Sequence, residues 1–271
     1  MTRPVTGPPA RPVVSGGLVL PLVTPVGPDG AVSEPCVRAL IGAARSGVAA
    51  LMPAISCGEG WRLSAEQWRA MVEFTVRHAD GLPCLVGAQV ATAAEAVERA
   101  AVAADLGADA VVVAPPMGGP ASPEAVYGHF ATVAAASELP VFVYNESAVS
   151  GNRIDRETLI RILRLDRVVG MKESSRSPET TRALVREAAD TPVFQGWEDL
   201  MLDTPGAAGL VAPLAHLDAG LCGALLRDRS PARQAAVTAA CHRYGLFGDD
   251  YVLRVKAELF RRGVIAHPGP V

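Results

Sequence analysis

Short apolar runs alternate with longer amphipathic stretches along most of this chain. From Gly17 onward, each run of strand length is followed by a segment whose apolar residues recur with the helical period. The runs lie at 18–23, 49–55, 83–88, 108–114, 140–144, 167–172, 192–195 and 209–213. Strands that alternate with helices are typical of parallel α/β folds, because two parallel strands need a long crossover connection.

The stretches between the runs predict helices, and two further helices follow the last run. We expect them at 34–46, from 64 onward, and at 92–106, 122–136, 155–163, 177–189, 198–203, 219–227, 231–244 and 251–262. Ser64 followed by Gln67 is a capping-box signature. Eight strand–helix units predict an α/β fold of the (β/α)8 TIM-barrel type with a C-terminal helical extension. A doubly wound sheet is the alternative, but the turn at 24–30 lacks its Gly-x-Gly-x-x-Gly pattern.

Composition agrees with one large globular unit. The chain has 271 residues, of which 49% are hydrophobic, and this is enough for a sizeable core. We expect a flexible Pro/Gly-rich leader at 1–16, the barrel at 17–228 and C-terminal helices at 229–271. A net charge of -3 without a basic stripe argues against nucleic-acid and membrane partners. Five scattered cysteines without metal-ligand spacing indicate reduced thiols and a cytoplasmic protein. No His/Asp/Glu cluster with ligand spacing falls at the ends of the apolar runs, so we expect no metal, and we expect no cofactor.

Lysine is almost absent from the chain. Of the 25 basic residues only Lys172 and Lys256 are lysines. Arginine stays charged in proteins, whereas a desolvated lysine can lose its proton and act as a nucleophilic amine. Lys172 ends the sixth apolar run, whereas Lys256 falls in a late amphipathic helix, where we expect an exposed surface charge.

The ends of the predicted strands carry the candidate chemistry, because barrel active sites lie at the C-terminal ends of the strands. The strand ends read Ser56–Glu59, Pro115–Met117, Tyr144–Glu146, Lys172–Glu173 and Gln195–Trp197. Lys172 and Tyr144 end neighbouring strands, so both side chains are expected at the mouth of the barrel. The amine of a lysine can attack a carbonyl carbon to form a Schiff base, and a phenol can move the protons that this reaction requires.

In this order, these segments resemble the dihydrodipicolinate synthase / N-acetylneuraminate lyase family of class I Schiff-base aldolases. The resemblance runs from about 17 to 215 and is carried by the segments 22–30, 56–59, 144–151, 170–173, 196 and 209–211. It implies a TIM barrel and a homotetramer or homodimer. The implied substrates are pyruvate or another 2-oxo acid and an aldehyde-type acceptor.

The resemblance also implies roles for individual residues. The 2-oxo acid would condense on Lys172, and Tyr144 would carry protons. Ser56 and the backbone around Cys57 would hold the carboxylate of the 2-oxo acid. Two further strand-end positions that match the family are Gly196 and Val211, and Val211 would line the barrel below the imine.

Several residues depart from the family pattern. Cys57 replaces a second hydroxyl residue, and a thiol is a poor hydrogen-bond donor. The pair at 116–117 replaces two aromatic residues, one of which completes a proton relay across subunits in the synthases. Val149 stands where synthases carry an arginine for the carboxylate of the second substrate, which argues against lysine biosynthesis. Glu146 replaces an apolar residue and is a candidate for binding a different acceptor.

Other polar residues at the mouth have two interpretations. They either recognise an aldehyde or amine-bearing substrate or belong to solvated loops; they are Trp61, Arg62, Glu198 and His216, together with Glu146. Three functions remain open from the residues alone. The first is a Schiff-base lyase, aldolase or synthase; the second is a dehydratase or hydratase–aldolase that uses the same imine; and the third is a non-catalytic binding descendant of the barrel.

Overall fold

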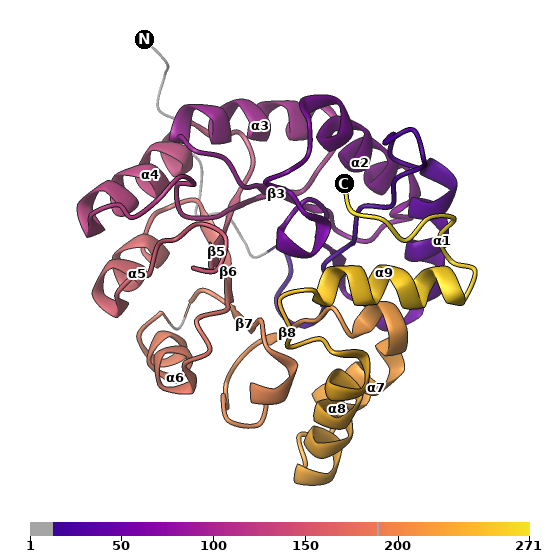
Figure 1. Ribbon diagram of the computed structural model, residues 1–271. Helices are drawn as coiled ribbons and strands as arrows, with labels where there is room; N and C mark the ends of the chain where they lie inside the picture. The colour runs from indigo at the N-terminus through magenta and orange to yellow at the C-terminus, as the bar shows by residue number, and fades with distance from the viewer. Residues whose placement is uncertain (1–12, 189) are drawn as a thin grey trace.

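Eight parallel strands form the centre of the molecule, and the helices surround them (Figure 1). The structure is a computed structural model that describes residues 13–188 and 190–271, so most of the predicted leader, 1–12, lies outside the described residues. The strands are β1 (Gly17–Leu20), β2 (Ala50–Leu51), β3 (Leu85–Ala88), β4 (Ala110–Val113), β5 (Val141–Asn145), β6 (Val168–Glu173), β7 (Val193–Gln195) and β8 (Gly209–Val211). Their order is β2-β1-β8-β7-β6-β5-β4-β3, and a bridge between Leu51 and Cys84 joins the two ends. The predicted TIM barrel is confirmed.

The helices begin and end close to the predicted residues. They are α1 (Glu34–Ala44), α2 (Ala65–His78), α3 (Ala93–Asp105), α4 (Pro123–Ala136), α5 (Arg156–Leu163), α6 (Pro178–Glu187), α7 (Ala215–Arg227), α8 (Pro231–Tyr244) and α9 (Tyr251–Arg261). The capping box is confirmed, since Ser64 and Gln67 exchange two hydrogen bonds at the start of α2. The helix predicted at 198–203 is a single 3-10 turn, η3 (Glu198–Leu200). None of the described helices combines the length and apolar composition needed to cross a bilayer.

The register of the central strands sets the position of the candidate site. Tyr144 in β5 pairs with Lys172 in β6, which in turn pairs with Phe194 in β7. Residues that pair in register point to the same face of a parallel sheet. The rings of Phe142 and Phe194 lie inside the barrel with Tyr144, in a buried apolar cluster. The interior is therefore filled by side chains, and Lys172 lies two residues beyond Gly170, the partner of Phe142, toward the C-terminal end of β6.

The expectation that Lys256 is a surface charge was wrong, because this side chain is completely buried. Its neighbours on the inner face of α9 are Val252, Val255 and Leu259, so the spacing i, i+3, i+4, i+7 places the lysine within the apolar stripe. Lys256 Nζ pairs with Glu59 Oε2 at 2.5 Å, which compensates the buried charge. Figure 1 shows the yellow C-terminal segment after α9 lying beside the indigo and violet N-terminal part of the barrel.

Candidate active site

Four side chains from four strand ends form a continuous hydrogen-bonded chain at the mouth of the barrel. Lys172 Nζ donates to Tyr144 Oη at 3.1 Å, and Tyr144 Oη donates to Ser56 Oγ at 3.3 Å. Gln89 Nε2 donates to the same Ser56 Oγ at 3.0 Å. All four residues are buried. The structure thus brings together the three residues predicted from the sequence and adds Gln89, which directly follows β3.

The directions of these hydrogen bonds leave one proton unused. Ser56 Oγ accepts from both Gln89 and Tyr144, so its own hydrogen is available for another acceptor. An amide cannot take up or release a proton at neutral pH, so the chain of exchangeable protons ends at Ser56. The arrangement can therefore pass a proton between Lys172, Tyr144 and an oxygen atom bound beside Ser56.

Both lysines are buried, but only Lys256 forms an ion pair among the described residues. Within 13–188 and 190–271, no carboxylate forms an ion pair with Lys172, whereas Lys256 is bound to Glu59. Lys172 Nζ instead lies 4.2 Å from the centroid of the Tyr144 ring. An amine that no carboxylate holds can approach a substrate carbonyl carbon. Lys172 therefore suits the role of a nucleophile, and Lys256 suits a structural role.

Ser56 and Cys57 lie on a short 3-10 turn, η2 (Ser56–Gly58), after β2. Thr24 Oγ1 donates to Gly58 O at 2.7 Å and ties this turn to the end of β1. Burial raises the pKa of the Cys57 thiol to about 12, so this side chain is neutral near pH 7. It offers a bound carboxylate only a weak S–H donor.

Glu198 is a buried carboxyl group near the amine of Lys172. Its Oε1 accepts from Leu214 N at 3.0 Å. Burial raises the pKa of Glu198 to about 7, although the charge of Lys172 acts in the opposite direction. The group therefore changes its charge near neutral pH, and sequence reasoning gave it only as one of several rim residues.

The other polar residues of the mouth fall into two groups. Trp61 and Arg62 are exposed, whereas Glu146 and His216 are buried like Glu198. The Glu146 carboxylate accepts from Val149 N and from the next backbone amide, both at 2.9 Å, and so closes the loop after β5. Its predicted contact with substrate stays a prediction.

Two further predicted residues lie where the strands end. Gly196 follows β7, and a Cβ atom there would lie 2.0 Å from Ser174 Oγ. Glycine therefore lets the end of β7 approach the segment after Lys172 closely. Val211 is fully buried in the apolar layer inside the barrel. The proposed roles of both residues toward a substrate stay predictions.

The buried imidazole of His216 should make the free energy of unfolding depend on pH. Desolvation lowers its pKa to about 4, against a backbone hydrogen bond to Pro21 that raises it. Because the unfolded chain binds the proton near pH 6.5, the stabilisation by neutral His216 is present above that pH and is lost toward pH 4. The raised pKa of Glu198 acts oppositely, since its contribution is lost as pH rises from about 4.5 to 7.

We therefore expect His216→Gln to change the shape of the curve of unfolding free energy against pH. Between pH 6.5 and 4, the wild type should lose up to about 3 kcal/mol relative to the variant. Urea denaturation at several pH values measures the difference, and Glu198→Gln should change the curve with the opposite sign. Parallel curves for the wild type and His216→Gln would contradict the assignment.

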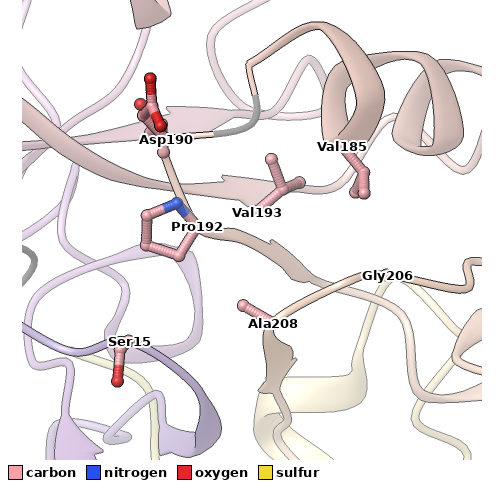
Figure 2. A pocket seen from close by; sticks show the side chains of 8 residues that line it. Ser15, Val185, Asp190, Pro192, Val193, Gly206 and Ala208 are labelled. Carbon is pink, nitrogen blue, oxygen red and sulfur yellow. The ribbon is translucent and has the colours of Figure 1, made fainter.

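A separate pocket of about 380 Å³ opens at the other end of the barrel. Figure 2 shows its lining near the start of β7, where Pro192 and Val193 face Val185 and Ala208. None of the four residues of the hydrogen-bonded chain lines it. The pocket lies at the N-terminal ends of the strands, whereas TIM-barrel chemistry takes place at the C-terminal ends.

Comparisons with known proteins agree with this geometry. The model of the dihydrodipicolinate synthetase family matches residues 14–265. The chain is 35% identical over 204 residues to the 4-hydroxy-tetrahydrodipicolinate synthase of Phenylobacterium zucineum, covering 74% of this chain and 67% of that protein. It is 31% identical over 234 residues to an uncharacterized DapA-like lyase of Halobacterium salinarum, covering 82% and 76%.

The fold also matches a solved structure. Dihydrodipicolinate synthase from Acinetobacter baumannii, solved in complex with pyruvate, superposes with a TM-score of 0.84 and 24% identity, covering 93% of this chain and 90% of that one. Members of the family are class I aldolase-type lyases that form or break carbon–carbon bonds. They use pyruvate and an aldehyde-type substrate and are typically oligomeric. Most related proteins bear the name of the synthase, so they do not confirm the expectation of a role outside lysine biosynthesis.

Proposed function

We propose that this chain, which belongs to the dihydrodipicolinate synthetase family, acts on pyruvate or another 2-oxo acid through an imine on Lys172. The observation that carries the proposal is the buried Lys172 Nζ, hydrogen-bonded to Tyr144 Oη at 3.1 Å and not ion-paired within the part of the chain that the structure describes. An unpaired amine beside a phenol is the pair of groups that imine formation needs.

The steps follow from the positions of these groups. Lys172 Nζ attacks the C2 carbonyl carbon, and Tyr144 Oη protonates the hydroxyl group that leaves as water. The protonated imine withdraws electrons, so the Tyr144 phenolate left by the first step takes a proton from C3 and an enamine forms. The enamine carbon then bonds to the carbonyl carbon of an aldehyde, whose oxygen takes the proton from Tyr144 Oη. Water adds to C2 of the resulting imine and releases the product from Lys172. Run in reverse, the same steps cleave a 4-hydroxy-2-oxo acid.

The carboxylate of the 2-oxo acid would lie against η2. The free proton of Ser56 and the backbone amide of Cys57 are the donors there, since the Gly58 amide donates to Ile55 O. Cys57 contributes a neutral thiol, so we infer weaker carboxylate binding than with two hydroxyl groups.

Cys57→Ser tests this inference. A hydroxyl group donates a stronger hydrogen bond to a carboxylate than a thiol does, so the half-saturating pyruvate concentration should fall about 3- to 10-fold. Titration of the imine trapped by borohydride measures it. Cys84→Ser is the matched control, because Cys84 is also buried but directly precedes β3, at the opposite end of the strand from the candidate site. An unchanged or higher half-saturating concentration for Cys57→Ser would contradict the proposed carboxylate site.

We further propose that the acceptor is not the dicarboxylate-like partner of lysine biosynthesis. The loop that follows β5 carries Val149 where synthases place an arginine, and the Glu146 carboxylate is bonded to backbone amides of the same loop. A carboxylate at 146 without a guanidinium group at 149 favours a neutral or amine-bearing aldehyde over a second carboxylate.

Isotope exchange and product analysis together test the proposed function. The wild type in deuterated water should exchange the C3 protons of pyruvate, and an aldehyde panel should identify the acceptor by the mass of the condensed product. Retention of every carbon of a 3-deoxy-2-oxo sugar acid in one product would indicate dehydration instead. Absence of exchange at C3 would contradict the imine mechanism.

A further inference from the structure

The second lysine of the chain ties the C-terminal helix to the turn that carries Ser56 and Cys57. Lys256 Nζ donates to Glu59 Oε2 at 2.5 Å and to Gly269 O at 3.1 Å. Glu59 is buried and directly follows η2. The imine chemistry uses neither charged group, although both are buried and Glu59 follows Cys57 by two residues.

The backbone on both sides of this turn is strained. Ala54 has φ +57° and Glu59 has φ +54°, in the left-handed region that residues with a side chain rarely adopt. Such conformations persist where the surroundings hold them in place, and they cluster at functional sites. Side-chain interactions hold the far end of η2. Thr24 donates to Gly58 O, and the Glu59 carboxylate binds buried Lys256 at 2.5 Å and, more weakly, exposed Arg62 at 3.7 Å.

A contribution to the stability of the fold does not by itself explain the buried ion pair between Lys256 and Glu59. Desolvation of two buried charges largely offsets their attraction, and apolar residues of similar volume often replace such a pair without loss. The rest of the inner face of α9 is apolar, with Val252, Val255 and Leu259. An aliphatic residue at 256 would continue that face, so the lysine is better explained by the group that it holds.

We propose that Lys256 is a positioning residue that acts through Glu59. It fixes the strained end of η2 so that Ser56 and the backbone amide at Cys57 face the carboxylate of the 2-oxo acid. This inference rests on the proposed imine at Lys172. It makes binding of the substrate carboxylate depend on a residue of the C-terminal helix α9.

The test compares two ketones that differ in the carboxylate. Pyruvate carries it and acetone does not, and both can form an imine that borohydride traps on Lys172. The variant Lys256→Met/Glu59→Gln removes both charges and leaves no unpaired buried carboxylate. We expect its half-saturating pyruvate concentration to rise about tenfold, the effect of one weakened hydrogen bond to a charged group, while that of acetone stays unchanged.

Further variants separate positioning from stability. Arg254→Met breaks an exposed ion pair with Asp250 on the same helix and should change neither value. Lys256→Arg keeps the charge that faces Glu59. It should therefore retain, at least in part, the preference for pyruvate over acetone that the double variant loses. Glu59→Asp keeps both charges, and Asp tolerates the left-handed region, so it provides a folded variant if the double variant does not fold. It should shift the preference in the same direction as the double variant.

The outcomes are distinct. Equal changes for pyruvate and acetone, or no change for either, would overturn the positioning role while leaving the imine intact. Failure of the wild type to trap pyruvate on Lys172 would overturn the proposed function and this inference together.

Discussion

Lys172→Met is expected to abolish imine chemistry, with a fall of about 10⁴-fold or more in the rate of C3 proton exchange. Methionine retains the length and apolar stem of the side chain but has no amine. Lys256 cannot substitute, because its ammonium group is fully buried and bound to Glu59. Exchange of deuterium into pyruvate, followed by NMR, measures the loss directly.

The same position offers a second substitution as a control. Lys172→Arg restores a basic group, but a guanidinium group stays protonated and does not act as the nucleophile, so activity should stay lost. Both variants should retain the far-ultraviolet circular dichroism of the wild type. Retention of a tenth of the wild-type exchange rate in either variant, by an order-of-magnitude criterion, would exclude Lys172 as the essential nucleophile.

Tyr144→Phe is expected to lower the rate of imine formation and of aldol turnover by about 10²- to 10⁴-fold. The variant keeps the ring beneath Lys172 Nζ and removes the Oη atom that joins Lys172 to Ser56. Proton transfer should suffer far more than binding, so the half-saturating pyruvate concentration should change much less than the rate. Stopped-flow measurement of imine formation separates the two effects.

Tyr127→Phe is the matched control for this substitution. Tyr127 lies on α4, where its ring stacks on Arg161, and phenylalanine preserves that contact. The control should have wild-type rates. A Tyr144→Phe variant that forms the imine at the wild-type rate would show that another group carries the proton.

The positions of the candidate site residues were predictable, because active sites of TIM barrels lie at the C-terminal ends of the strands and the order of the strands can be predicted from the sequence. Alternation of apolar runs and helices gave the eight units, and the C-terminal ends of the fifth and sixth runs then placed Tyr144 beside Lys172. Their pairing in the sheet confirms that prediction. Gln89 directly follows β3 and was accessible to the same rule, but no chemistry was assigned to that strand end.

Burial of single polar residues was harder to predict. Glu198 begins the 3-10 turn η3 and His216 lies in the first turn of α7, and the burial of both side chains depends on how these two elements pack on the barrel. Lys256 did leave a signal, since it stands between Val255 and Leu259 on the apolar face of a helix. Its partner lies 197 residues away in the sequence, and no local pattern identifies such a contact.

The most direct test of the central claim is reduction of the wild type with borohydride in the presence of pyruvate, followed by peptide mass spectrometry. The chain has only two lysines, so the assignment is unambiguous. We predict a reduced pyruvate adduct on the peptide that contains Lys172 and an unmodified Lys256. An unmodified Lys172, under conditions that label a known class I aldolase, would contradict the account.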